Sequence, residues 1–127
     1  MIILGDKNIP YDHIEIIKSI DDIKSTLPNS IVLFEYDIDI LKYCYKNNIN
    51  TMVKINSIVD GLYANSLNSY YILVDETIAY DMQQIAQNYM FDSKIIQLID
   101  NTDQMEKIAK NNIDGVVFKN ILKGLDI

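Results

Sequence analysis

Residues 31–74 read IVLFEYDIDILKYCYKNNINTMVKINSIVDGLYANSLNSYYILV, and this stretch decides the fold. It holds three short apolar runs, at 31–34, 52–55 and 71–74, separated by two longer segments in which apolar residues recur at helical spacing. Short apolar runs rich in β-branched and aromatic residues are typical of strands that are covered on both faces. Their alternation with helices predicts a parallel sheet built from successive βα units.

The same alternation continues on both sides of this stretch. Two apolar runs precede it, at 2–4 and 14–17, and two follow it, at 95–99 and 116–118. Either of the first two runs could be the first strand of the sheet. No linker or low-complexity tract interrupts the chain, so we assign residues 1–127 to one domain. We predict a three-layer, Rossmann-like α/β domain with a mainly parallel sheet of five to seven strands.

Asparagine marks the turns that lead into several of these strands. Asn29, Asn48, Asn68 and Asn112 each stand shortly before an apolar run, where a helix or loop must reverse direction. Asparagine tolerates the left-handed backbone that such turns require. The segment KNNIN at 46–50 also recurs as KNNID at 110–114, each time before a strand. We interpret the recurrence as one turn used twice.

The composition excludes several classes of function. The chain has 18 acidic and 11 basic residues, a formal net charge of −7, and no arginine. An acidic protein without arginine is poorly suited to grip nucleic acid phosphates or base edges. One histidine, His13, and one cysteine, Cys44, cannot form the usual zinc sites or an internal disulfide. The helical spacing around Cys44 predicts a small core residue.

The N-terminal apolar run is too short to serve as a membrane or targeting segment. It spans residues 1–4 and is interrupted by Gly5, Asp6 and Lys7, whereas a membrane-spanning helix needs roughly 20 apolar residues. We therefore expect a cytoplasmic protein that does not insert into the membrane.

Carboxylates follow several of the predicted strands. In an open α/β sheet, ligands bind in the crevice at the carboxyl ends of the strands. Carboxylates there would repel phosphate and would suit ribose hydroxyls or a cation. The same residue types are also favoured helix N-caps, and this alternative stays open. The candidate ligand-binding residues are Gly5, Asp6, Glu35, Asp37 and Asp75.

From Ile31 onward the order of elements resembles a known family. A strand ending in the acid Glu35 is followed by a helix at 39–47, a strand at 52–55 and a helix at 57–65. A strand followed by Asp75, a long helix ending near Tyr89, a strand at 94–99 and a turn and strand at 112–117 complete the pattern. It is similar to the Rossmann domain of the RCK family, also called KTN or TrkA-N domains, which sense nucleotides in the cytoplasm for potassium channels and transporters.

The resemblance implies specific roles and partners. Glu35 would hold the ribose hydroxyls of adenosine, Asp75 would lie beside the cleft, and a membrane channel or transporter would be the partner. The sequence departs from the family at its glycine-rich loop, because Gly5 is followed by Asp6 and the run at 14–17 by Lys18. Without glycines the backbone cannot approach a pyrophosphate. We therefore expect a degenerate nucleotide site and assign no cofactor.

An uncharged flank on the long helix predicts a subunit interface. Tyrosine and amide side chains without charge suit a protein surface that becomes covered by a partner, although a solvated uncharged flank is the alternative. The RCK resemblance also implies pairing through helices late in the fold, so we expect a homodimer or another homo-oligomer. The candidate interface residues are Tyr80, Gln84, Gln87, Tyr89, Met90 and Phe91.

The sequence contains no clear catalytic arrangement. His13 stands at the start of an apolar run, where a surface histidine is expected more often than a general base. We predict a non-enzymatic, self-associating regulatory or ligand-sensing domain. One alternative is a small magnesium-dependent enzyme or receiver-like phosphoacceptor that uses Asp6 with Asp37 or Asp75. The other is a purely structural interaction module.

Overall fold

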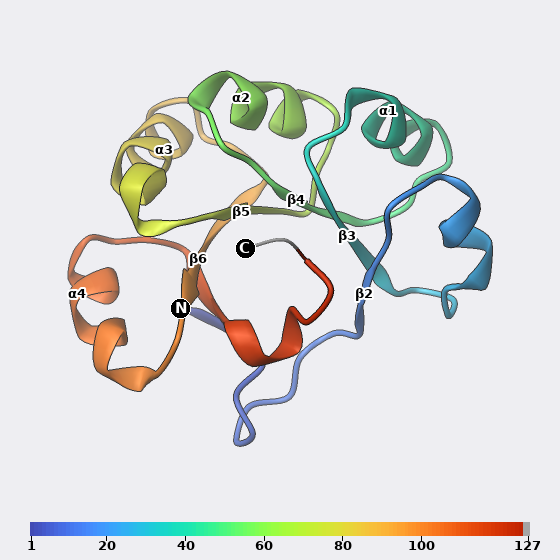
Figure 1. The fold of residues 1–127 in the computed structure, drawn as a ribbon. Helices are drawn as coiled ribbons and strands as arrows, with labels where there is room; N and C mark the ends of the chain where they lie inside the picture. Colours follow the sequence, from blue (N-terminus) through green and yellow to red (C-terminus); the bar gives the residue numbers. More distant parts are fainter. Residues whose placement is uncertain (126–127) are drawn as a thin grey trace.

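The computed structural model of the protein describes residues 1–125 and shows seven strands connected mainly by helices (Figure 1). The strands are β1 (Ile2–Leu4), β2 (Ile14–Ile16), β3 (Ile31–Glu35), β4 (Thr51–Lys54), β5 (Tyr71–Val74), β6 (Lys94–Ile99) and β7 (Gly115–Phe118). The α-helices are α1 (Ile38–Lys46), α2 (Ile58–Ser66), α3 (Glu76–Asn88) and α4 (Met105–Lys110), and the 3₁₀-helices are η1 (Asp21–Ser25), η2 (Thr102–Gln104) and η3 (Lys119–Ile121). Every predicted strand is present, and both N-terminal runs are strands.

All seven strands are parallel and belong to one sheet, in the order β1-β7-β6-β5-β4-β3-β2. From β2 to β7, strands that are consecutive in sequence are neighbours in the sheet. In a doubly wound sheet the strand order reverses at a switch point, whereas the order from β2 to β7 runs in one direction. Because βαβ crossovers are right-handed, strands that advance in one direction place their helices on one face of the sheet.

The sheet curls, and its two faces are covered by different parts of the chain. Helices α1 to α4 lie outside the curl, while the C-terminal segment lies inside it (Figure 1). Within that segment Leu122 is only 1% exposed and packs with Leu33 and Leu73 on the inner face. Helices, sheet and C-terminal segment form three layers. The predicted class, a three-layer α/β domain with a mainly parallel sheet, is confirmed.

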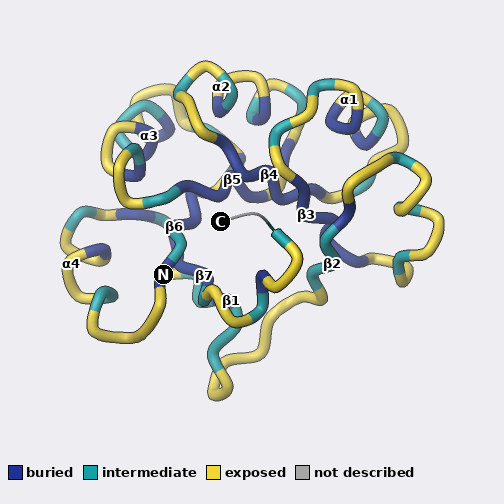
Figure 2. Tube along the Cα trace, in the orientation of Figure 1, coloured by how far each residue is buried: buried dark blue, intermediate teal, exposed yellow. Residues whose placement is uncertain are grey.

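Alternation along the strands produces two separate apolar clusters. In β3, Phe34 belongs to the cluster beneath the helices, whereas Leu33 belongs to the cluster on the inner face. In β5, Ile72 and Leu73 divide in the same way. In Figure 2 the buried residues are concentrated on the strands, and the exposed residues lie on the outer turns of the helices. Strands that are buried on both faces account for the continuous apolar runs in the sequence.

The asparagine turns have the predicted geometry. Asn29, Asn48, Asn68 and Asn112 all have positive φ, between 54° and 65°. After α1 the amide of Ile49 donates to the carbonyl of Cys44, and after α4 the amide of Ile113 donates to that of Ile108. The interpretation of the KNNIN and KNNID segments as one turn used twice is therefore confirmed.

Two single residues also lie where the sequence indicated. Cys44 lies on the buried side of α1 and is fully buried. His13 is at the surface, with Nε2 3.6 Å from Oε2 of Glu15.

Among the helices of residues 1–125, none has the length and apolar character needed to cross a bilayer.

Candidate functional site

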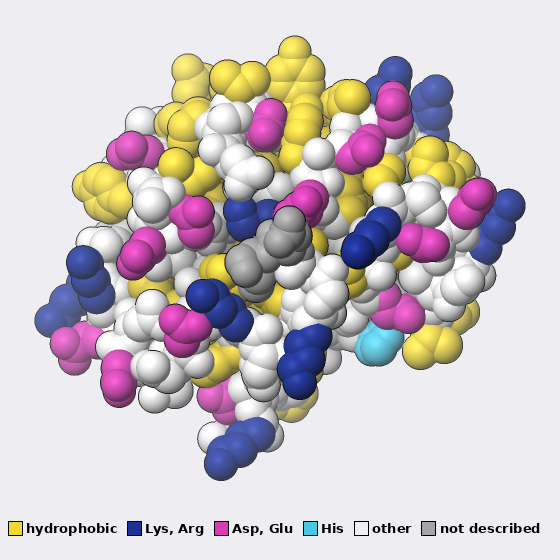
Figure 3. Space-filling view, viewed as in Figure 1, with side chains coloured by type: hydrophobic (Ala, Val, Ile, Leu, Met, Phe, Trp, Pro, Cys, Tyr) yellow, Lys and Arg dark blue, Asp and Glu magenta, His cyan; other side chains and the backbone are white. Residues whose placement is uncertain are grey.

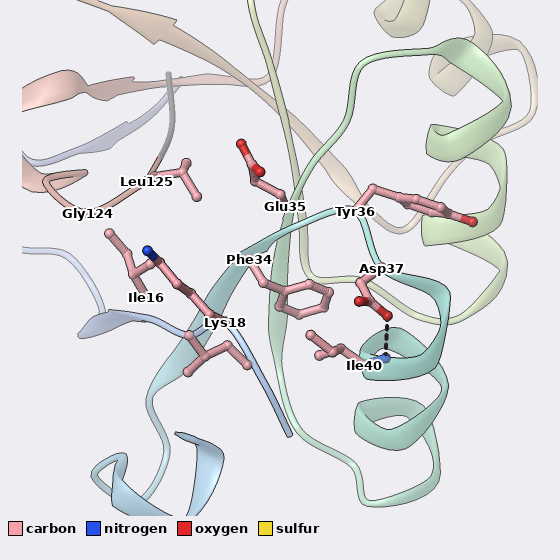
Figure 4. A pocket seen from close by; sticks show the side chains of 10 residues that line it. Ile16, Lys18, Phe34, Glu35, Tyr36, Asp37, Ile40, Gly124 and Leu125 are labelled. Carbon is pink, nitrogen blue, oxygen red and sulfur yellow. Dashed lines mark hydrogen bonds between the residues drawn. The ribbon is translucent and has the colours of Figure 1, made fainter. Parts of the chain in front are cut away.

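A cavity of about 430 Å³ lies at the carboxyl ends of β2 and β3 (Figure 4). Two of the predicted ligand-binding residues, Glu35 and Asp37, line it together with Lys18. Glu35 is the last residue of β3, and Lys18 follows β2. The parallel pairing of these two strands brings their carboxyl ends together, so an acid and a base from different strands border one opening.

The remaining walls of this β2–β3 cavity are mostly apolar. Phe34 and Ile40 come from β3 and α1, and Leu125 comes from the C-terminal segment. In Figure 4, Leu125 lies across the opening from Phe34. The cavity therefore joins an apolar body to a charged rim, the combination common in sites for small organic ligands.

A buried lysine lies next to the charged rim. Lys54 is the register partner of Glu35 on the neighbouring strand β4 and is only 6% exposed. Its Nζ donates to the carbonyl of Ile55 at 3.1 Å and to Oδ1 of Asn56 at 2.9 Å. Sequence reasoning missed Lys54, although a lysine inside the apolar run at 52–55 was a visible signal. Its charge partly offsets the carboxylates of this edge.

Asp75 serves as the N-cap of α3. Its Oδ1 accepts hydrogen bonds from the backbone amide and the hydroxyl of Thr77. The Thr77 hydroxyl is the main cause that lowers the pKa of the Asp75 carboxyl, and the charge of Lys54 contributes. Asp75 thus stays ionised, but its carboxylate is engaged in capping and lies outside the β2–β3 cavity.

The first amides of the helices at this edge are bound by the chain's own side chains. Oδ1 of Asp37 accepts from the amides of Asp39 and Ile40 at the start of α1. Ser57 caps α2, and Asn101 and Gln104 form a capping box at η2. A phosphate that approached α1 or α3 would meet a carboxylate in place of free amides. The N-cap interpretation holds here, and it argues against phosphate binding.

Gly5 and Asp6 lie away from the other candidates. Both line a different cavity, of about 760 Å³, beside β1 and η3. Asp6 closes a local turn by accepting from the amide of Asn8 at 2.7 Å. Gly5 has φ of 93°, and an added Cβ would come within 3.1 Å of Ile121. Because β1 is the edge strand opposite β2, these two residues are not brought to Glu35.

The acids of the magnesium alternative also remain apart. Asp6 lines the cavity beside β1, Asp37 caps α1, and Asp75 caps α3. Among residues 1–125 no group of three or more histidine, cysteine, aspartate or glutamate side chains is arranged to hold a metal ion.

The predicted interface residues divide between two sides of α3. Tyr80 lines a cavity shared with α4, and Nε2 of Gln87 donates to the carbonyl of Asn112 at 3.4 Å. Tyr89 and Phe91 line a groove shared with α2. Gln84 is half-buried on the helix between them, and Met90 is 84% exposed at its end. Tyr80 therefore lines one cavity beside α3, and Tyr89 and Phe91 line another.

The groove between α2 and α3 is the more apolar of these two sides. Leu62, Ile85, Tyr89 and Phe91 line it, and Tyr63 on α2 is 54% exposed. Figure 3 shows hydrophobic side chains gathered over α2, whereas lysine and acidic side chains are interspersed on the rest of that face. Sequence reasoning found the α3 half of this groove and missed the contribution of α2.

The chain was also compared with known proteins. Neither the scan against models of protein families nor the search of curated proteins found a match.

Proposed function

We propose that this protein is a ligand-sensing regulatory domain that binds a small molecule in the β2–β3 cavity. The observation that carries the proposal is the meeting of Glu35, Lys18 and an apolar wall around one opening at the carboxyl ends of parallel strands. The C-terminal segment supplies Leu125 to that wall, so a bound ligand would contact the segment that covers the inner face of the sheet.

The ligand is a molecule with hydroxyl groups or a positive charge, without phosphate. Glu35 is the last residue of its strand and is exposed at the rim. Its side chain points toward the opening (Figure 4). Its carboxylate would accept hydrogen bonds from hydroxyl or ammonium groups. The capped starts of α1 and α3 disfavour phosphate for the reason given above.

A regulatory role is favoured over catalysis by where the reactive groups lie. Cys44 is buried with a raised pKa, and His13 lies beside Glu15 at the surface. Neither lines the β2–β3 cavity. The role is the one that the RCK resemblance implies, but the sequential strand order gives that resemblance no support, so the proposal rests on the cavity. A channel or transporter partner stays a prediction.

Chemical-shift mapping by NMR tests the proposal. The ¹⁵N-labelled protein is titrated with ribose, arginine and putrescine as probes and with ATP as a phosphate-bearing comparison. We expect saturable shifts of the amides of Tyr36 and Leu125 with at least one of the first three probes. Glu35→Gln should weaken that binding about tenfold, because a charge-assisted hydrogen bond becomes neutral.

Glu106→Gln is the matched control, since Glu106 is an exposed acid on α4 that pairs with Lys110. It should leave binding unchanged. Preferential binding of ATP at this edge, or the absence of saturable shifts there with every probe at about 10 mM, would overturn the proposal.

We propose in addition that the domain self-associates through the groove between α2 and α3. The groove exposes apolar side chains in an acidic protein, and uncharged surfaces are where two copies of a protein with net charge −7 can approach each other. Sedimentation velocity tests this, with Tyr89→Lys expected to shift the protein toward the monomer. Tyr11→Lys, at an exposed tyrosine far from the groove in sequence, is the control.

A further inference from the structure

A cavity of about 560 Å³ lies between α3 and α4, on the helical face of the sheet. It is separate from the β2–β3 cavity and shares no lining residue with it. Its lining includes Gln97, the buried polar residue of strand β6. Gln97 follows Ile96 and precedes Leu98 in the strand, so its side chain alone breaks an otherwise apolar run at 95–99.

The Gln97 side chain is buried and forms no hydrogen bond with another residue of the 1–125 range. Gln97 is only 6% exposed. In that range every fully buried side-chain nitrogen or oxygen has a hydrogen-bond partner. The nitrogen and oxygen of the Gln97 amide therefore keep some contact with solvent, and Gln97 lines the cavity between α3 and α4.

The Gln97 amide is available to whatever occupies the cavity, water or a ligand. Other buried polar side chains of the protein are engaged, as Gln83 shows by accepting from the amide of Asp114 at 2.9 Å. Gln97 carries a hydrogen-bond donor and an acceptor side by side, and it lines a cavity large enough for a small molecule.

The walls of the cavity define the kind of ligand that fits. Tyr80 is 53% exposed at the rim and offers an aromatic face. Ile108 supplies an apolar contact, and Glu76 and Asp103 outnumber Lys107 among the charged residues. An aromatic face suits a planar ring, a donor beside an acceptor suits the edge of a nucleobase, and carboxylates suit hydroxyls better than phosphates.

We propose that the cavity between α3 and α4 binds an uncharged nucleobase or its nucleoside. The Gln97 amide pairs with the edge of the base, and the Tyr80 ring stacks on its face. Glu76 and Asp103 are placed to accept hydrogen bonds from ribose hydroxyls, so a nucleoside gains contacts that the free base lacks. This site is independent of the ligand proposed for the β2–β3 cavity.

Titration of the ¹⁵N-labelled full chain with adenosine, followed by NMR, tests the site. We expect saturable shifts of the side-chain NH₂ signals of Gln97 and of the backbone amide of Ile108. Purine riboside, which lacks the exocyclic amino group, should bind about tenfold more weakly, and adenine should reveal the share of the ribose. The amides of Tyr36 and Leu125 at the other cavity should not move, which separates this result from the proposed function.

Two variants make the result decisive. Gln97→Leu should abolish the preference for adenosine over purine riboside, and Tyr80→Ala, at an exposed position, should weaken adenosine about tenfold without disturbing the fold. Gln84→Leu, on α3 but outside the cavity, is the matched control and should bind normally. Shifts that do not saturate at about 10 mM, or binding that survives Gln97→Leu with its preference intact, would show a cavity filled by solvent only and overturn the proposal.

Discussion

Asn48 and Asn112 hold the same left-handed backbone conformation after α1 and α4, with φ of 54° and 60°. Asn68 has φ of 61° after α2. Met90 takes the equivalent position after α3, with φ of 52°, and the amide of the next residue, Phe91, donates back to the carbonyl of Ala86 at 2.8 Å. A methionine in this conformation costs about 1 kcal/mol more than a residue that tolerates it. Its side chain is 84% exposed, so burial within the chain does not offset that cost.

The strained position of Met90 leads to a prediction about stability and association together. Met90→Asn should raise the free energy of unfolding by about 0.5–1 kcal/mol, because asparagine is favoured where the backbone is left-handed. It should also weaken self-association, because it removes an apolar side chain at the end of the proposed interface. Urea denaturation and sedimentation velocity on the same samples measure the two effects.

Met90→Leu separates the backbone effect from the side-chain effect. Leucine keeps the apolar contact and the unfavourable backbone, so stability and association should both stay close to those of the natural protein. A Met90→Asn variant that is stabilised but associates normally would place the contact between copies elsewhere on the surface.

The capping carboxylate of Asp75 should make stability depend on pH. Its pKa in the folded protein is lowered from 3.8, first by the hydrogen bond from Thr77. The ionised form therefore contributes stability that is fully present above the unfolded pKa and is lost as the pH falls through the lowered folded value. Asp75→Asn can still accept the capping hydrogen bonds but has no charge to titrate.

Urea denaturation from about pH 7 to about pH 2 measures this contribution. The natural protein should be more stable than Asp75→Asn near neutral pH, by less than about 1 kcal/mol since the site is largely solvated, and the difference should vanish at the acid end. Asp103→Asn, at the start of η2, is a control in which the acid serves no capping role. A constant difference between the natural protein and Asp75→Asn across the range would contradict the assigned role.

Burial should make Cys44 unreactive in the folded protein. Burial raises the pKa of its thiol to about 11, and its side chain is fully covered. At pH 8 only about one molecule in a thousand would carry the reactive thiolate. Iodoacetamide should therefore label the native protein very slowly and the protein in guanidinium chloride quickly, as followed by mass spectrometry. Rapid labelling under native conditions would show that the region of α1 opens often.

The elements of the fold could be predicted from sequence, and the strand order could not. The run at 31–34 is apolar because both of its faces are covered, and this signal is local. Which strand pairs with which is decided by contacts between distant residues. The pairing of β1 with β7, for example, joins Ile3 to Val116, and no spacing within either run indicates it. A curled sheet with a C-terminal inner layer therefore appeared only in the structure.

The candidate site was partly predictable for the same reason. Glu35 ends β3 and Asp37 follows it, so their shared position at the carboxyl edge depends on local sequence, and they do line one cavity. Grouping them with Asp6 required knowledge of the strand order. Lys54 and Gln97 were overlooked because each lies within an apolar run. A polar residue inside a run of buried strand residues is a signal that could have identified both.

The inner layer formed by the C-terminal segment gives the last prediction. Leu122 is 1% exposed and packs in the cluster on the inner face of the sheet, whereas Leu27 is 61% exposed. Leu122→Ala should lower the free energy of unfolding by about 2–4 kcal/mol, because it removes buried methyl groups and leaves a cavity. Leu27→Ala is the matched control and should change it by less than about 0.5 kcal/mol. Equal effects of the two variants in urea denaturation would mean that the segment is not a structural layer of the fold, and that the inner face of the curled sheet is covered by something else.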